Sequence, residues 1–360
     1  MDPTVLVGGR DATRMQAVQF AGHGGTEVVE YGEVPDPEVG RGDVLVDVKA
    51  GALNHLDVWT RRGMPQLDLA MPHVPGSDAA GVVVETGADV TRFGEGDRVA
   101  VSAGVFCGDC EFCRDGDYPL CTSFHVLGEH VPGVHSEYAA VPEDNLVPVP
   151  ENVEWETAAA APLVFQTAWR MLHTRADIEA DEKVLVLGAS GGVGHAAVQI
   201  AAHAGAEVYA TASSPEKLRY AEEIGAEHAI DYTETDFADE VRAHTGKRGV
   251  DVVVDHVGEA TWSDSLRSLA KGGRLVTCGA TSGGRPETHV QRLFWNQLSV
   301  LGSTMATPGE ADDALSLVWD GTFDVRIRDV LPMSETARAH ERLENREGFG
   351  KVVVIPDSER

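Results

Sequence analysis

Two patterns of apolar and polar residues divide this chain of 360 residues near residue 150. Before that point, short apolar runs rich in β-branched residues alternate with turns that contain Gly or Pro. The clearest runs are Met15–Phe20, Val44–Val48, Ala80–Val84 and Arg98–Ser102. Short runs bounded in this way are typical of strands joined by tight turns. The first part of the chain is therefore predicted to form a compact all-β barrel.

The second pattern begins after Pro148–Asn152, which we interpret as a hinge. Helical periodicity starts near Trp155, and from Lys183 onward strand-like runs alternate with helical stretches such as Val193–Ala202. Alternation of this kind predicts an α/β region with a doubly wound parallel sheet. The expected strands of this sheet are Val184–Leu187, Val208–Ala212, His228–Asp231, Val252–Asp255, Arg274–Cys278 and Ser299–Gly302. The run Gly350–Ile355 at the end of the chain is expected to be an edge or barrel strand.

A Gly-rich turn, A-S-G-G-V-G, lies between the strand Val184–Leu187 and the helix Val193–Ala202. Gly191 permits a tight turn, Gly192 lets the backbone approach a pyrophosphate, and Gly194 lets the helix pack closely on the strand. The helix N-terminus adds free N–H groups and positive dipole for phosphates. The predicted dinucleotide contacts at this turn are Gly191, Gly192, Val193 and Gly194.

Length and composition favour two domains with sizeable cores, since 42% of the residues are hydrophobic. No run approaches the ~20 apolar residues that span a bilayer, so no membrane partner is expected. Residues 1–14 contain no apolar segment of the signal-peptide type and are expected to be a disordered extension. We therefore expect a cytoplasmic enzyme.

The formal charge is −29, from 29 basic and 58 acidic residues. Such a field repels nucleic acid and anionic membranes, which excludes nucleic acid as a partner. The acidic residues are scattered through the sequence rather than gathered in a tail. They are explained either by adaptation of the whole surface to high salt, which screens the self-repulsion, or by an acidic face that binds a partner.

Four of the five cysteines lie within fifteen residues, with the spacing C-x2-C-x2-C-x7-C. Four thiolates can complete a tetrahedral shell, so Cys107, Cys110, Cys113 and Cys121 are predicted to bind one structural zinc. Disulfides and an iron–sulfur cluster are the alternatives. The shell leaves no open position, so this metal would not take part in catalysis. Cys278 stands apart and is interpreted as a small buried residue near the nucleotide.

The β-rich first part, the four-cysteine lobe and the Gly-rich unit, in this order, resemble the medium-chain dehydrogenase/reductase superfamily, which includes zinc alcohol dehydrogenases and quinone oxidoreductases. The resemblance runs from Met15 to Val354. It implies a GroES-like β-barrel catalytic domain over residues 15–155 and 306–360, with the zinc lobe at 105–123. It also implies a Rossmann domain that binds NADP over residues 156–305, and an active site in the cleft between the two domains.

The chain departs from the zinc alcohol dehydrogenases at each expected ligand of the catalytic zinc. Asn54 stands in place of a Cys, Gly-His-Glu is replaced by Gly76-Ser77-Asp78, and Pro162–Phe165 contains no ligand. Leu56 also replaces the hydroxyl residue that relays a proton. Without a Lewis acid, the charge that develops on oxygen must be delocalised or held by hydrogen bonds. The resemblance is therefore to the quinone oxidoreductase branch, with a small-molecule substrate.

The function predicted from these residues is NADPH-dependent hydride transfer to an activated C=C or a quinone. The catalytic candidates are Asn54, as an oxyanion donor, and His55, at a position that often contacts the pyrophosphate. An alcohol dehydrogenase that uses His55, Asp57 and Asp78 as metal ligands is the first alternative. A non-catalytic NADPH-binding scaffold or sensor is the second.

The coenzyme is predicted from the end of the second strand of the Rossmann unit. Ala212 stands where NAD enzymes carry an acid for the ribose hydroxyl. Ser213 can donate to a 2′-phosphate and Lys217 can neutralise it, and Tyr232 resembles a tyrosine that closes over this phosphate. The other coenzyme candidates implied by the resemblance are Thr167, Val257, Gly279, Ala280 and Lys351. The edge strand Ser299–Gly302 also suggests a homodimer or homotetramer.

Overall fold

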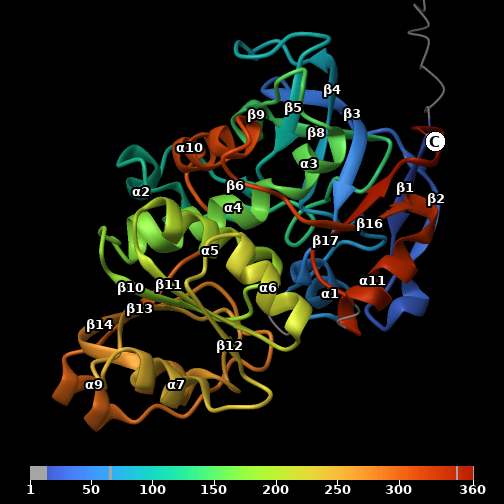
Figure 1. Ribbon diagram of the computed structural model, residues 1–360. Helices are drawn as coiled ribbons and strands as arrows, with labels where there is room; N and C mark the ends of the chain where they lie inside the picture. The colour runs from blue at the N-terminus through green and yellow to red at the C-terminus, as the bar shows by residue number, and fades with distance from the viewer. Residues whose placement is uncertain (1–13, 65–66, 346–347, 360) are drawn as a thin grey trace, which may run out of the picture.

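Two β-sheets organise the fold of the computed structural model, which describes residues 14–64, 67–345 and 348–359 (Figure 1). The first is a seven-stranded sheet and the second a six-stranded parallel sheet. The predicted extension over residues 1–14 lies outside the described residues except for Arg14, which begins the first strand. None of the helices described is both long and apolar enough to cross a bilayer.

The seven-stranded sheet is built mainly from the first part of the chain. Along the sheet the order is β16-β17-β3-β4-β5-β9, and β8 also pairs with β3. Neighbouring strands are antiparallel except β16 and β17. These strands are β3 (Asp43–Ala52), β4 (Asp78–Thr86), β5 (Arg98–Val101), β8 (Tyr138–Pro142), β9 (Leu146–Pro148), β16 (Ile327–Pro332) and β17 (Lys351–Ile355). Two smaller sheets pair β1 (Arg14–Gln19) with β2 (Glu30–Pro35) and β6 (Gly104–Val105) with β7 (His125–Val126).

The prediction that this part is all-β was incomplete. Helix α1 (His55–Arg62) follows β3 directly, and the short α2 (Glu111–Arg114) lies in the cysteine lobe. In α1 the Asp57 carboxylate accepts a 2.7 Å hydrogen bond from the backbone N–H of Asn54, the N-cap residue. A cap of this kind satisfies an N–H that the helix itself cannot, and so fixes where α1 begins.

The parallel sheet has the order β12-β11-β10-β13-β14-β15, which confirms the predicted doubly wound fold. Its strands are β10 (Lys183–Val186), β11 (Glu207–Ala212), β12 (His228–Asp231), β13 (Val250–Val254), β14 (Leu269–Thr277) and β15 (Ser299–Gly302). The strand order reverses between β10 and β13. Ligands of such sheets bind at this reversal, outside the carboxyl ends of the strands.

Helices cover both sheets (Figure 1). Two of them, α3 (Trp155–Ala160) and α11 (Thr336–Glu344), pack on the seven-stranded sheet. The helices on the side of the parallel sheet are α4 (Pro162–Trp169), η4 (Arg170–Arg175), α5 (Gly192–His203), α6 (Pro215–Glu223), α7 (Phe237–His244), α8 (Trp262–Ser268), α9 (Val290–Asn296) and α10 (Pro308–Trp319). Helix α5 begins within one residue of the predicted Val193. The helical pattern after the Gly-rich turn therefore located this element closely.

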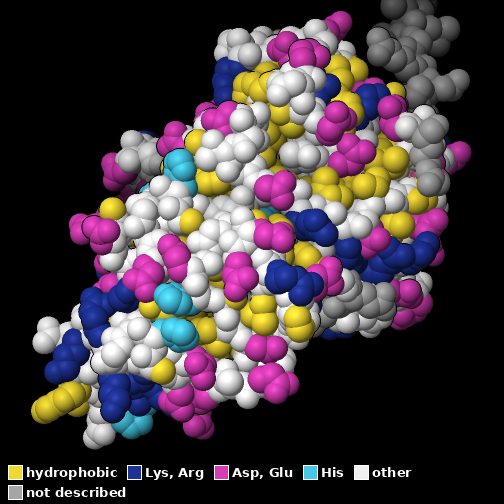
Figure 2. All heavy atoms as spheres, in the orientation of Figure 1, with side chains coloured by type: hydrophobic (Ala, Val, Ile, Leu, Met, Phe, Trp, Pro, Cys, Tyr) yellow, Lys and Arg dark blue, Asp and Glu magenta, His cyan; other side chains and the backbone are white. Residues whose placement is uncertain are grey.

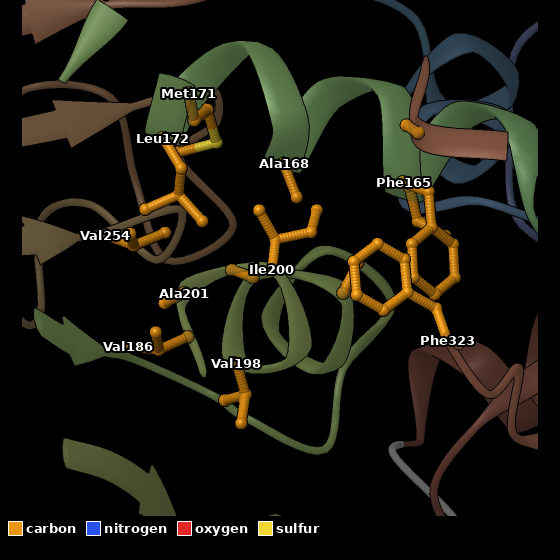
Figure 3. Close-up of a cluster of buried hydrophobic side chains, with 14 of the residues drawn as sticks. Phe165, Ala168, Met171, Leu172, Val186, Val198, Ile200, Ala201, Val254 and Phe323 are labelled. Atoms are coloured by element: carbon orange, nitrogen blue, oxygen red, sulfur yellow. The ribbon is translucent and has the colours of Figure 1, made fainter. Parts of the chain in front are cut away.

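The largest apolar core fixes α4 against α5 and the sheet. Phe165 on α4 stacks on Phe323 with ring centroids 5.7 Å apart, and Ile200 on α5 lies in the same cluster (Figure 3). Val186 and Val254, from two adjacent strands, complete the floor of this cluster. Because buried side chains are close-packed, α4 cannot shift relative to the Gly-rich turn that precedes α5 without opening a cavity.

The last strand returns to the first sheet and brings distant residues together. β17 runs antiparallel to β3, with Val353 opposite Ala52, and the Leu53 N–H donates to the Val352 carbonyl at 2.9 Å. Lys351 is therefore held beside Asn54, at the start of α1. This is the point where the candidate site begins.

Candidate active site

Asn54, Asp78 and Lys351 form a buried polar cluster in which each side chain contacts the other two. The Lys351 ammonium donates to Asn54 Oδ1 at 2.6 Å and lies 3.2 Å from Asp78 Oδ2. Asn54 Nδ2 donates to the same Asp78 oxygen at 2.8 Å. Asp78 is fully buried, and Asn54 and Lys351 are 7% and 4% exposed.

This cluster determines the orientation of the Asn54 amide. An ammonium only donates and an ionised carboxylate only accepts, so the amide oxygen must face Lys351 and the amide nitrogen must face Asp78. The nitrogen carries two hydrogens and Asp78 takes one of them. Among the described residues no second acceptor contacts Asn54 Nδ2. The second N–H is thus available to a ligand oxygen.

Burial changes the acidity of the two carboxyl groups behind Asn54. It raises the pKa of Asp57 to about 7, although the Asn54 N–H and the Lys351 charge oppose the shift. Burial likewise raises the pKa of Asp78, and Lys351 and the Asn54 side chain oppose it. The Lys351 ammonium therefore opposes the effect of burial and favours the ionised form of both carboxyl groups.

Among the described residues, those at the expected positions of a catalytic zinc do not bring three His, Cys, Asp or Glu donor atoms together. Ser77 uses its hydroxyl to donate to the Leu127 carbonyl at 2.7 Å, and Leu163 contributes only a backbone N–H, which donates to Asp78 Oδ1 at 2.9 Å. The cationic group present is Lys351. His55, proposed as a substitute ligand, is exposed on α1 beside Trp59, with ring centroids 6.3 Å apart.

The four cysteines of the lobe do fit a metal. Within the described parts of the chain they are the one group of three or more His, Cys, Asp or Glu side chains whose donor atoms lie within 4.8 Å of one another. A tetrahedral zinc with Zn–S bonds of about 2.3 Å separates its sulfurs by about 3.8 Å. The Sγ separations that agree are Cys107–Cys113 at 3.9 Å, Cys110–Cys113 at 3.5 Å and Cys107–Cys121 at 3.5 Å. Disulfide bonds, at about 2.05 Å, are incompatible with these distances.

The Gly-rich turn forms a cradle in which two glycines have no room for a side chain. A Cβ at Gly194 would lie 2.1 Å from the Gly188 carbonyl oxygen, and one at Gly192 would lie 2.7 Å from Val164. Gly191 is the N-cap of α5, and Val193 is half-buried beside it. Gly191 is exposed and Gly192 is half-buried, so backbone N–H groups at the start of this twelve-residue helix are accessible to a diphosphate. These residues fit a nicotinamide dinucleotide.

Two side chains face this cradle from other elements. Lys351 Cδ lies 3.7 Å from the position of a Cβ on Gly192, and His256 Nε2 lies 3.4 Å from that of a Cβ on Gly188. His256, which the sequence analysis missed, follows β13 at the sheet edge. Burial lowers its pKa while Asp255 opposes the shift. The signal was its place directly after a parallel strand next to the Gly-rich strand.

The residues predicted to read the adenosine phosphate lie together at the ends of β11 and β12. Lys217 Nζ is 3.5 Å from Ser213 Oγ, and Ser214 caps α6 by accepting the Lys217 N–H at 3.4 Å. The Tyr232 N–H donates to the Ala212 carbonyl at 3.3 Å, and the Tyr232 side chain is 46% exposed. An ammonium, a hydroxyl and an exposed aromatic residue thus lie at the ends of these strands, at one corner of the predicted nucleotide site.

The opposite end of the site opens into a cavity of about 570 Å³ at the carboxyl ends of β14 and β15. It is lined by Gly279 and Ala280 and, across from them, by Pro119 and Leu120 of the cysteine lobe. Trp59 on α1 comes within 3.8 Å of the position of a Cβ on Gly279, so α1 and the parallel sheet meet here.

The two remaining predicted contacts lie near this edge. Thr167 on α4 is 5% exposed, and its hydroxyl lacks a partner among the described residues. Buried hydroxyls are normally hydrogen-bonded, so this one is suited to a ligand. Val257 begins the loop after β13, where its N–H donates to Asp255 Oδ1 at 2.9 Å. Gly258, the next residue, lines the cavity.

The chain was compared with known protein families and proteins. Residues 40–151 match the family described as "Alcohol dehydrogenase GroES-like domain", and residues 192–320 match "Zinc-binding dehydrogenase". A quinone oxidoreductase from Pseudomonas aeruginosa is 34% identical over 350 residues, which cover 94% of this chain and 99% of that protein. An acryloyl-coenzyme A reductase from Metallosphaera sedula is 32% identical over 348 residues, with coverage of 94% and 99%.

A solved structure described as an NAD-dependent alcohol dehydrogenase is similar over its whole length. Its TM-score is 0.90 at 43% identity, and the alignment covers 95% of this chain and 99% of that one. The GroES-like part, the parallel-sheet part and their order are thus shared with full-length relatives. This chain is an oxidoreductase, and it belongs to the medium-chain dehydrogenase/reductase superfamily.

Proposed function

We propose that this protein uses NADPH to reduce carbon–carbon double bonds conjugated with a carbonyl group, and quinones, without a catalytic zinc. The observation that carries the proposal is the Lys351–Asn54–Asp78 cluster, in which a buried ammonium stands among the positions of the family's zinc ligands. The similarity to a quinone oxidoreductase and to an acryloyl-coenzyme A reductase supports this reaction class.

The chemistry follows from the amide geometry. A reduced nicotinamide supplies a hydride, and the residues that would hold the coenzyme are those of the Gly-rich turn, Lys217 and Thr167. When hydride adds to the β-carbon of an enone, negative charge develops on the carbonyl oxygen. The free N–H of Asn54 can donate to that oxygen from a fixed position, because Lys351 and Asp78 hold the amide. An enone or quinone delocalises the remaining charge itself, so a metal is not needed.

The experiment combines a metal count with substrate assays at high salt, because the surface is strongly acidic (Figure 2). We expect one zinc per chain by elemental analysis, and oxidation of NADPH by 3-penten-2-one and 1,4-benzoquinone. We expect no zinc-dependent oxidation of simple alcohols. Two zincs per chain, together with an alcohol oxidation that is lost on chelation and restored by added zinc, would establish the alcohol dehydrogenase alternative.

Coenzyme choice is tested at Lys217. Replacing Lys217 with alanine removes one charge-assisted contact to a 2′-phosphate, worth about 1.5–3 kcal/mol. We expect the Kd for NADPH to rise roughly 10- to 100-fold while the Kd for NADH stays unchanged. Both constants are measured by fluorescence titration, with Lys271→Ala, at an exposed site, as the control. A wild-type protein that prefers NADH would overturn the NADPH assignment.

We also propose that two chains associate through the edge of the parallel sheet. On and beside this edge, α9 and β15 leave large apolar side chains exposed. They are Val290 at 64%, Phe294 at 63%, Trp295 at 76% and Val300 at 42%. Contiguous apolar side chains at an unpaired strand edge favour pairing with a second chain. The homodimer predicted from the sequence would cover them.

A further inference from the structure

Glu129 lies in a tight turn that covers the segment leading into the active-site cluster. The Gly128 N–H donates to the Val131 carbonyl at 2.9 Å, and the Glu129 N–H donates to the Val126 carbonyl at 3.1 Å. Gly128 has φ +78°, a left-handed conformation that glycine tolerates best. The backbone therefore fixes the point from which the Glu129 side chain leaves.

This turn is anchored on residues adjacent to Asp78. The Ser77 hydroxyl donates to the Leu127 carbonyl at 2.7 Å, and His73 Nε2 lies 3.1 Å from the Gly128 carbonyl oxygen. A Cβ on Gly128 would come within 2.4 Å of the Gly76 carbonyl oxygen. The turn thus packs directly on the Gly76-Ser77-Asp78 segment.

Apolar side chains of this turn pack in a cluster with residues of α1 and α4. Leu127 and Val131, on either side of Glu129, belong to the same cluster as Leu56, Leu163 and Met305. Leu56 is the second residue of α1, two positions after Asn54, and the Leu163 N–H donates to Asp78. The turn that carries Glu129 therefore belongs to an apolar cluster that also contains residues adjacent to Asn54 and bonded to Asp78.

The immediate partner of the Glu129 carboxyl group favours its protonated form. His130 Nδ1 lies 3.6 Å from Glu129 Oε2, and the same Nδ1 accepts the Val126 N–H at 3.3 Å. That nitrogen therefore carries a lone pair and no proton. No described residue donates a hydrogen bond to the Glu129 carboxyl group. An ionised Glu129 carboxylate would be repelled by the lone pair on His130 Nδ1. A protonated carboxyl group avoids this repulsion.

The burial of Glu129 also favours the protonated form of its carboxyl group. Burial raises the pKa of Glu129 to about 7. The titratable groups around Glu129 are three histidines. His130 is its neighbour, and the rings of His125 and His130 lie with centroids 5.6 Å apart. His73 contacts the Gly128 carbonyl oxygen. Burial and the neighbouring His125 lower the pKa of His130. The Glu129 side chain is still 14% exposed, so water can reach it.

We propose that Glu129 is the general acid that protonates the α-carbon of an enone substrate. This rests on the proposed function. Hydride addition forms a C–H bond at the β-carbon and moves the π electrons of the C=C bond into an enolate. The Glu129 O–H bond then breaks and its proton forms the second C–H bond, at the α-carbon. Glu129 is left as a carboxylate and regains a proton from water, so the net reaction consumes one hydride and one proton.

The first test needs no coenzyme. Infrared difference spectra between the wild type and Glu129→Gln, recorded across pH, report the carboxylic-acid C=O band of Glu129. We expect this band at pH 6 and expect it to disappear as the pH rises through about 7. Absence of the band at pH 6 would mean that Glu129 is ionised there, which overturns the proposal.

The second test compares two substrates that differ in where the proton goes. Reduction of 3-penten-2-one requires protonation at carbon, whereas reduced 1,4-benzoquinone is protonated at oxygen, which water does directly. General acids contribute about 10²- to 10⁴-fold, so Glu129→Gln should lower kcat for the enone at least ~100-fold. The quinone rate should change less than about threefold. Glu129→Asp should recover part of the enone rate, and the exposed Glu95→Gln should change neither.

The outcomes separate this inference from the proposed function. Equal losses with both substrates would assign Glu129 a structural role, and unchanged rates with both would also overturn the proposal. Failure of the wild type to reduce either substrate would instead overturn the proposed function. A wild-type enone rate that falls as the pH rises above about 7, with a flat profile for the quinone, would support the acid role.

Discussion

Replacing Asn54 with alanine should lower kcat/KM for 3-penten-2-one by about 100- to 1,000-fold. Loss of one preorganised oxyanion donor costs about that much in other enzymes. The effect should be large here because Lys351 and Asp78 hold the amide through both of its polar atoms. Steady-state kinetics with a fixed, saturating concentration of NADPH measure the change.

Two controls separate this effect from others. The Kd for NADPH, measured by fluorescence, should stay within about threefold of the wild-type value, since the coenzyme contacts proposed here lie mainly on the Gly-rich turn and at Lys217. Asn152→Ala, at an exposed position, should leave kcat/KM unchanged. An Asn54→Ala enzyme that retains most of its enone reductase activity would rule out Asn54 as the oxyanion donor.

The second large effect is expected at Lys351, and it is an effect on stability. Lys351→Met leaves Asp78 buried without its cation, and breaking a buried ion pair in this way costs about 3–5 kcal/mol. We expect a melting temperature several degrees below that of the wild type, measured by calorimetry. Lys271→Met, which replaces an exposed lysine, should change it little.

The pH dependence of this loss has a definite sign. The pKa values of Asp57 and Asp78 are already raised by burial in the presence of Lys351, and its removal should raise them further. A carboxyl group whose pKa is higher in the folded state favours folding at low pH, and that contribution is lost as the pH rises through the folded pKa. The Lys351→Met variant should therefore lose stability as the pH rises from 5 to 8.

A double variant tests the cause. Asp78→Asn removes the carboxylate that Lys351 neutralises, so Asp78→Asn combined with Lys351→Met should be more stable than Lys351→Met alone at pH 8. If the double variant is as unstable as the single one, the loss comes from the packing of the Lys351 side chain and not from its charge.

Much of the fold could be predicted from local sequence patterns. The alternation of strands and helices after Lys183 predicted the parallel sheet, because each strand buried on both faces is a short apolar run and each helix carries its own periodicity. Helix α1 was missed because its eight residues carry mostly polar side chains and give a weak apolar signal. Asn54 is a typical N-cap residue, but from the sequence we interpret it only as an oxyanion donor and not as the start of a helix.

The sequence by itself determined most of the strands, the Gly-rich turn and the spacing of Cys107, Cys110, Cys113 and Cys121, because each depends on residues close together in the chain. Only the tertiary structure decided that Lys351 meets Asn54 across 297 residues and that the turn carrying Glu129 is anchored on Ser77. The first contact depends on the pairing of β17 with β3 and the second on a turn folded over Gly76. Long-range pairing and burial set the charges of these groups, and neither can be deduced from the spacing of the residues along the chain.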